Sequence, residues 1–215
     1  MEQQTVHLFV FEGFADWEAA YAVAGINSYR QFQLRPGQYA VRTVGAGAHA
    51  VRTMGGVTVV PDMTVEDLTR GSSAMLILPG GTAWDEGKNS EVLQIAGVFL
   101  RSGVPVAGIC GATAGLARAG LLDSKRHTSN AREYLKMTGY RGEDLYQDAP
   151  AVTDGDLITA GGMSPVDFAR HIFEKLGLYN KPVLDAWCGL FKTGDASYYT
   201  ALLEASAGTG NTIKE

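Results

Sequence analysis

The sequence has few cysteines and no long apolar run, and these absences argue against several classes of protein. Its 215 residues include two cysteines, Cys110 and Cys188, which lie far apart and without metal-ligand spacing. Neither a disulfide framework nor a metal site is therefore indicated. No apolar run approaches the roughly 18–20 residues that span a bilayer, and residues 1–6 lack a basic segment leading into an apolar one. We expect a cytoplasmic protein with no membrane partner.

Clusters of basic residues are also missing. The net charge is -5 at pH 7, and Lys and Arg gather nowhere along the chain. Because nucleic-acid binding depends on neutralising phosphates, we expect no nucleic-acid partner. No cofactor is expected either. The composition, 46% hydrophobic and 19% charged, is that of an ordinary globular protein.

Glycine, in contrast, is abundant, with 27 residues that gather where predicted strands meet predicted helices. Alternating strands and helices predict an α/β fold: a doubly wound, mainly parallel sheet sandwiched by helices, with extra C-terminal helices. The predicted strands are 6–11, 32–44, 74–78, 104–109 and 152–160, the last with a hairpin turn at 154–155, and a further hairpin covers 51–61. The predicted helices are 16–25, 90–101, 112–119, 131–137, 164–177, 182–191 and 197–205.

We find no linker or repeat. Residues 1–180 are expected to form the α/β domain, residues 181–207 to pack on it as helices, and residues 208–215 to be a frayed tail. Capping signals mark several helix starts. Asp16 and Asn130 are predicted N-caps, and Thr64 with Asp67 has the spacing of a capping box.

Cys110 lies at the corner between a predicted buried strand and a predicted helix. Such a corner, a nucleophile elbow, needs small neighbours, and Gly108, Gly111 and Ala112 meet that need. The N-terminus of the following helix is expected to favour the thiolate. The alternative is a cysteine that only fills the core.

Three loops are predicted to meet beyond the carboxyl ends of the strands: residues 12–18, 79–85 and 109–111. Ligand sites of doubly wound sheets lie there. Their convergence favours a functional Cys110. Taken alone, Glu18 has a simpler interpretation as an acidic residue in the first turn of a helix.

Four motifs, at 11–18, 76–81, 107–112 with 120–122, and 157–162, together resemble the ThiJ/PfpI superfamily, which has the class I glutamine amidotransferase-like fold. The similarity spans about residues 6–178. Residues 126–130, 140–143, 148–150 and 186–195 are similar to a bacterial branch of that superfamily labelled glutamine amidotransferase.

This resemblance implies roles for particular residues. Cys110 would be the nucleophile, and Glu18 would hydrogen-bond its thiolate. Gly81 and Gly111 would supply the backbone N–H groups of an oxyanion hole. A homodimer would be in keeping with the superfamily.

The sequence also departs from the family pattern. Glutaminases of this fold carry His-x-Glu after the last strand, where this chain has no histidine in residues 161–166, and PfpI-type proteases carry histidine where Gly111 stands. Neither activity is expected. A histidine of other relatives aligns with Ser129, and His127 lies two residues away, so His127 is either a catalytic residue or a solvated one. Trp84, Asp16 and Ser129 are predicted to line the pocket.

Three functions remain open. The first is an enzyme that uses the Cys110 nucleophile on a small-molecule substrate in a hydrolase-like or lyase-like reaction. The second is a stress-response protein that senses oxidants or electrophiles through Cys110. The third is a binding or oligomeric scaffold in which Cys110 has no chemistry.

Overall fold

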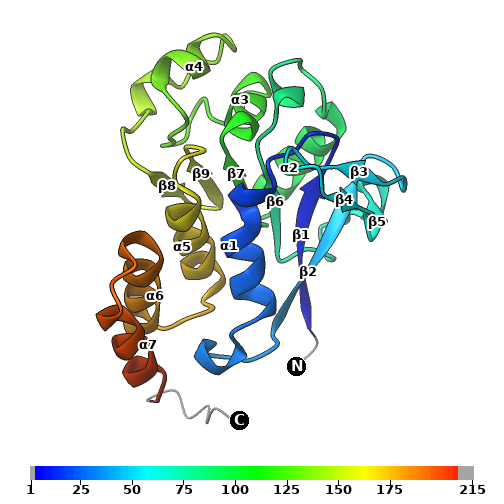
Figure 1. Cartoon of the computed structure of the whole chain (residues 1–215). Helices are drawn as coiled ribbons and strands as arrows, with labels where there is room; N and C mark the ends of the chain where they lie inside the picture. The colour runs from blue at the N-terminus through cyan, green and yellow to red at the C-terminus, as the bar shows by residue number, and fades with distance from the viewer. Residues whose placement is uncertain (1–2, 208–215) are drawn as a thin grey trace.

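The computed structural model describes residues 3–207, so the predicted tail at 208–215 lies outside the described residues. Its centre is a seven-stranded sheet of order β5-β2-β1-β6-β7-β9-β8 (Figure 1). All neighbours are parallel except β8 and β9, which form an antiparallel hairpin. The strands are β1 (Gln4–Val10), β2 (Tyr39–Gly45), β5 (Met63–Thr64), β6 (Met75–Leu78), β7 (Val106–Ile109), β8 (Ala151–Asp154) and β9 (Leu157–Ala160). A separate hairpin pairs β3 (Val51–Arg52) with β4 (Thr58–Val59).

Helices flank this sheet. α1 and α5 pack side by side in front of it in Figure 1, and α6 lies between α5 and α7. The helices are α1 (Asp16–Asn27), α2 (Ser90–Arg101), α3 (Gly111–Arg118), α4 (Arg132–Lys136), α5 (Pro165–Leu176), α6 (Lys181–Thr193) and α7 (Ser197–Ala207). Short 3-10 helices are η1 (Arg30–Phe32), η2 (Val65–Asp67), η3 (Thr82–Trp84) and η4 (Glu143–Leu145).

The direction of winding reverses at β1, which pairs with β2 on one side and β6 on the other. Right-handed crossovers on the two sides of this point put their helices on opposite faces of the sheet. Every residue of β6 and β7 is buried, as their unbroken apolar sequences predict for central parallel strands. The predicted doubly wound α/β fold is confirmed. Its crevice opens where β1, β6 and β7 end.

Most predicted elements are present, including both hairpins and the Thr64 capping box. The strand predicted at 32–44 begins only at Tyr39, because Phe32 ends η1 and Pro36 lies in a turn.

Two predicted N-caps are wrong. The N-cap of α1 is Ala15, and the Asp16 carboxylate instead accepts a hydrogen bond from the Thr53 hydroxyl at 2.9 Å. The N-cap of α4 is Ala131, one residue beyond Asn130. In both cases a polar side chain that sequence assigns to the local helix makes a tertiary contact instead.

Candidate active site

Cys110 occupies the corner between β7 and α3. Its backbone has φ 57° and ψ −124°, a conformation that costs energy for any residue with a Cβ. The Cys110 N–H donates to the Ala160 carbonyl at 3.0 Å, which ties the corner to the end of β9. Strain of this kind persists only where surrounding contacts hold it, and here it turns the side chain toward the crevice.

Two buried hydroxyls hold the corner from behind. The Thr113 hydroxyl donates to the Cys110 carbonyl at 2.6 Å. Because its one proton is used there, the 2.6 Å contact with the Ser129 hydroxyl must have Ser129 as donor. The chain of hydrogen bonds therefore runs from Ser129 through Thr113 to the strained residue.

Thr113→Val is expected to lower the free energy of unfolding by about 1–2 kcal/mol, because it removes the hydroxyl that donates to the Cys110 carbonyl and leaves the buried Ser129 hydroxyl without its acceptor. Urea denaturation measures the change. Thr113→Ser retains the hydroxyl and serves as the control. Equal stability of Thr113→Val and wild type would contradict a supporting role for this hydrogen bond.

Glu18 lies against Cys110 from α1, with 1% of its surface exposed. Its carboxylate accepts the Gly80 N–H at 2.5 Å and a hydrogen bond from the Cys110 thiol. Burial raises the pKa of Glu18, and these two hydrogen bonds lower it. Burial, followed by the Glu18 charge, raises the pKa of Cys110 to about 11, while hydrogen bonds from Asn130 and Gly111 lower it.

The Gly111 N–H at the start of α3 acts in the expected direction, because it lowers the pKa of the Cys110 thiol. Burial and an adjacent carboxylate outweigh the helix end, because one low-dielectric site holds a single negative charge far more readily than two. The proton of Cys110 has an acceptor in contact with it, the Glu18 carboxylate.

Two glycines allow this close contact between Glu18 and Cys110. A Cβ on Gly80 would lie 2.7 Å from Glu18 Oε2, and a Cβ on Gly162 would lie 2.9 Å from Cys110 Sγ. Any side chain at either position would push into the thiol. The Gly161-Gly162 pair is visible in the sequence as a strand-ending turn, but its approach to Cys110 is not.

Gly81 and Gly111, the predicted oxyanion-hole residues, are neighbours. A Cβ on Gly111 would lie 3.2 Å from the Gly81 nitrogen. Gly81 has φ 150°, which favours glycine, and within residues 3–207 its N–H has no hydrogen-bond acceptor. The Gly111 N–H donates toward the Cys110 sulfur. The Gly81 nitrogen therefore lies close to Gly111, the residue that follows Cys110.

Asn130 contacts the thiol although the sequence did not place it at the site. Its Nδ2 donates to Cys110 Sγ at 3.3 Å, and its Oδ1 accepts the Gly162 N–H at 2.8 Å. Asparagine before a predicted helix is typical of an N-cap, so the local pattern pointed elsewhere.

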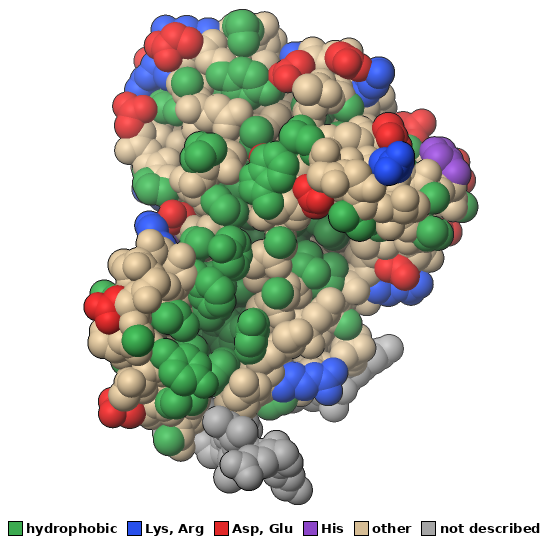
Figure 2. All heavy atoms as spheres, in the orientation of Figure 1, with side chains coloured by type: hydrophobic (Ala, Val, Ile, Leu, Met, Phe, Trp, Pro, Cys, Tyr) green, Lys and Arg blue, Asp and Glu red, His purple; other side chains and the backbone are tan. Residues whose placement is uncertain are grey.

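A cavity of about 370 Å³ opens over the thiol. Its lining residues are Trp17, Glu18, Cys110, Ser129, Asn130, Ala149, Pro150, Gly161, Gly162, Met163 and Ser164. Trp17 and Met163, at its edge, are 48% and 95% exposed. Figure 2 shows hydrophobic side chains on the same front face, from the upper end of α1 down between α1 and α6. The mouth is therefore apolar, and the floor carries the thiol and the carboxylate.

Of the residues predicted to line the pocket, only Ser129 does so. Trp84 is fully buried in the core, where its ring meets Phe11 at a centroid distance of 5.5 Å and its indole N–H donates to the Pro79 carbonyl at 2.8 Å. Asp16 is held by Thr53, outside the lining. The apolar bulk of Trp84 and the tertiary partner of Asp16 explain both errors.

His127 does not approach the thiol. Its Nδ1 contacts the Lys125 carbonyl at 2.6 Å and therefore carries the proton, and its Nε2 accepts from the Tyr140 hydroxyl at 3.1 Å. The ring is fully buried, and burial lowers its pKa, so it stays neutral. His127 is therefore neither at the thiol nor exposed to solvent. Its ring packs in the interior and links Lys125 to Tyr140 through hydrogen bonds.

Within the part of the chain that the structure describes, no group of three or more His, Cys, Asp and Glu side chains is placed to hold a metal ion. None of the helices within residues 3–207 combines the length and the apolar character needed to cross a bilayer.

Fold and site together define a class: an α/β protein with a strained cysteine at a strand-to-helix corner and a buried carboxylate beside it. The chain belongs to the DJ-1/PfpI family, whose profile matches residues 4–175. The resemblance to the ThiJ/PfpI superfamily is thereby confirmed.

Individual relatives are similar over nearly the whole length. The chain is 38% identical to the Bacillus subtilis (strain 168) protein named uncharacterized protease YoaZ, covering 94% of this chain and 98% of that one. A thiJ/pfpI family protein from Bacillus anthracis matches with TM-score 0.88 at 40% identity, over 95% and 99% of the two chains. A DJ-1 superfamily protein from Agrobacterium tumefaciens matches with TM-score 0.79 at 32% identity, over 92% and 100%.

Proposed function

We propose that this protein is an enzyme in which Cys110 attacks the electrophilic carbon of a small neutral molecule, in a hydrolase-like or lyase-like reaction. The observation that carries the proposal is the contact between the Cys110 thiol and the buried Glu18 carboxylate, at the floor of a cavity. A nucleophile in contact with its own proton acceptor is the arrangement that covalent catalysis requires.

The first step follows from the contacts. The S–H bond breaks and its proton passes to Glu18, while the sulfur electron pair forms a bond to the substrate carbon. For a carbonyl substrate, the π electrons move to oxygen, and the Gly81 N–H, which has no acceptor within residues 3–207, donates to that oxygen. Glu18 then returns the proton to that oxygen. One proton and one electron pair are conserved, and no histidine takes part.

The cavity lining supports a small and uncharged substrate. Its volume of about 370 Å³ suits a compact molecule rather than a folded peptide segment. Glu18 is the one acidic group among the lining residues, and no Lys, Arg or His is among them. A substrate carboxylate or phosphate would therefore lack a cationic partner and would meet a buried acid.

A turnover panel combined with selective alkylation tests this proposal. The panel comprises amides, isonitriles, glyoxals and glycated amines. Iodoacetamide is expected to label Cys110 and leave Cys188 unlabelled, because Cys188 is buried. Turnover of the active compound should fall in proportion to Cys110 labelling, read by peptide mass spectrometry. Full turnover after complete labelling of Cys110 would overturn the proposal.

The same panel separates the second candidate, a sensor of oxidants. That role is supported by the N–H donors of Asn130 and Gly111 that face the sulfur, since they would also accommodate oxygen atoms added to it. Selective oxygen addition to Cys110 under mild peroxide, with no turnover of any panel compound, would favour sensing over catalysis.

A further inference from the structure

The Asn130 amide is held in one orientation by its neighbours. The Gly162 N–H can only donate, so the end of the amide that it meets at 2.8 Å must be oxygen. The other end, Nδ2, is then directed at Cys110 Sγ, 3.3 Å away. Gly161 allows this arrangement, because a Cβ there would lie 3.0 Å from the Ser129 carbonyl oxygen. The turn after β9 and Asn130, two residues before α4, therefore act together on the thiol.

We propose that Asn130 is a catalytic residue, a fixed N–H donor that stabilises negative charge on the Cys110 sulfur while leaving Glu18 as the acceptor of the thiol proton. Its catalytic meaning rests on the function proposed above. An amide takes up no proton near neutral pH, so Asn130 stabilises the anion without competing for the proton. A charge-assisted hydrogen bond of this kind is stronger than one between neutral groups.

The groups around the sulfur leave this assignment unambiguous. Two titratable groups interact with Cys110: Glu18 on α1 raises the pKa of the thiol, and Tyr134 on α4 has its own pKa raised by Cys110. Burial and the hydrogen bond to Asp85 raise the pKa of Tyr134, so it remains protonated in the neutral range. His127 is engaged elsewhere through both ring nitrogens. The pH dependence of thiol reactivity therefore belongs to the Cys110–Glu18 pair, biased by Asn130.

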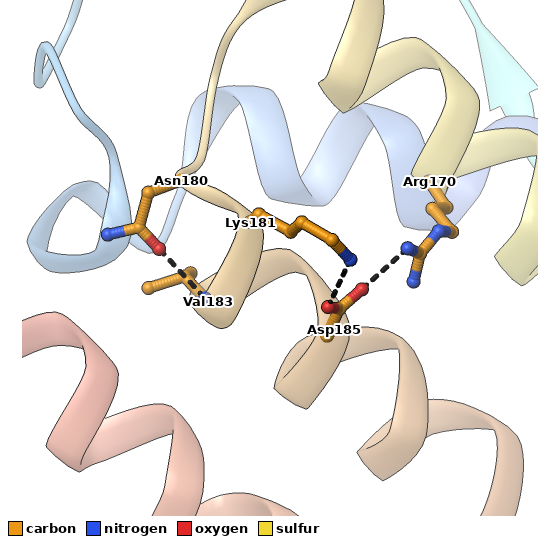
Figure 3. A network of polar contacts seen from close by, with 5 residues as sticks. All are labelled: Arg170, Asn180, Lys181, Val183 and Asp185. Atoms are coloured by element: carbon orange, nitrogen blue, oxygen red, sulfur yellow. Dashed lines mark hydrogen bonds and ion pairs between the residues drawn. The ribbon is translucent and has the colours of Figure 1, made fainter.

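Asn130→Asp separates the donor role from a merely structural one. The aspartate keeps the size of the side chain and an oxygen for the Gly162 N–H, but it replaces the donor on sulfur with a carboxylate oxygen. Asn130→Ala removes both contacts. Asn180→Asp is the matched control. Asn180 Oδ1 likewise accepts a backbone N–H, that of Val183 at 2.8 Å (Figure 3). Asn180 is the N-cap of α6 and does not line the cavity.

The experiment is the second-order rate constant for alkylation of Cys110 by iodoacetamide, measured from neutral to alkaline pH. Below the thiol pKa, we expect the constant to fall about threefold in Asn130→Ala and about tenfold in Asn130→Asp, whose charge also repels the thiolate. Asn180→Asp should match wild type. Thermal unfolding of each variant shows whether the fold is intact.

An alkylation rate constant for folded Asn130→Asp within about twofold of wild type would overturn the assignment of Asn130 as a donor to the sulfur. The substitution removes the donor and adds a negative charge, and both changes should lower the fraction of Cys110 present as thiolate. If Asn130→Asp does not fold, Asn130→Ala decides by the same criterion. Alkylation needs no substrate, so this result is independent of the turnover panel. If alkylation of Cys110 is slowed in the variants but the wild-type protein turns over no panel compound, the result would contradict the proposed enzyme and still establish the hydrogen bond from Asn130 to the sulfur.

Discussion

Cys110→Ser is expected to lower turnover of the panel compound that the wild-type protein consumes by at least about 10³-fold. A serine hydroxyl holds its proton far more tightly than a thiol, and the Glu18 carboxylate is too weak a base to remove it. The fold should survive, because oxygen replaces sulfur at an unchanged corner and the Thr113 hydrogen bond to the Cys110 carbonyl remains. The measurement is kcat/KM alongside thermal unfolding.

Cys188→Ser is the matched control for that result. Cys188 is buried on α6 and does not line the cavity, so its replacement should leave kcat/KM near the wild-type value. Comparable turnover in Cys110→Ser and wild type would contradict the proposed role of Cys110 as the nucleophile.

Trp84→Ala is expected to lower the free energy of unfolding by about 3–5 kcal/mol, the usual loss for a large buried side chain. The indole is fully buried, and a Cβ on Gly115 would lie 2.5 Å from it. The substitution also removes the indole hydrogen bond to the carbonyl of Pro79, which lies two residues before Gly81 of the proposed oxyanion hole. Urea denaturation measures the loss, and turnover of the remaining folded protein should fall as well.

Two further variants separate the packing of the Trp84 ring from its hydrogen bond. Trp84→Phe keeps an aromatic ring but loses the N–H, so we expect a smaller loss of about 1–2 kcal/mol. Trp17→Ala removes an indole that is 48% exposed at the cavity mouth, and its cost in stability should be well below that of Trp84→Ala. The reverse order would mean that Trp84 lines the pocket after all.

The parts of the site that the sequence predicted correctly depend on local chemistry and chain order. The apolar run before Cys110 and the small residues after it predict a strand, a sharp turn and a helix, and the structure has β7, the strained corner and α3 in that order. Because parallel strands end at one edge of a sheet, the loops that carry Glu18 and Gly81 were also predicted to meet the thiol.

Asn130 and Asp16 were misassigned for one shared reason. Sequence pattern describes how a residue suits its own element, and a polar residue before a helix is most simply a cap. Asn130 instead reaches Cys110 and Gly162, and Asp16 reaches Thr53. Those partners are distant in sequence, so no local period or spacing encodes them. His127 is a similar case. It lies two residues from Ser129, the position that aligns with a histidine of other relatives, but its ring nitrogens contact Lys125 and Tyr140 and not the thiol.

By itself, the sequence determined the α/β fold, the order of its strands along the chain and the position of Cys110 at a strand-to-helix corner. Hydrophobic periodicity and glycine placement act within a few residues, and they suffice for those features. The tertiary structure alone decided the environment of the thiol: burial and Glu18 keep its proton bound, Gly80 and Gly162 allow the approach, and Asn130 directs a donor at the sulfur. Each of these effects depends on distances between segments that only folding brings together.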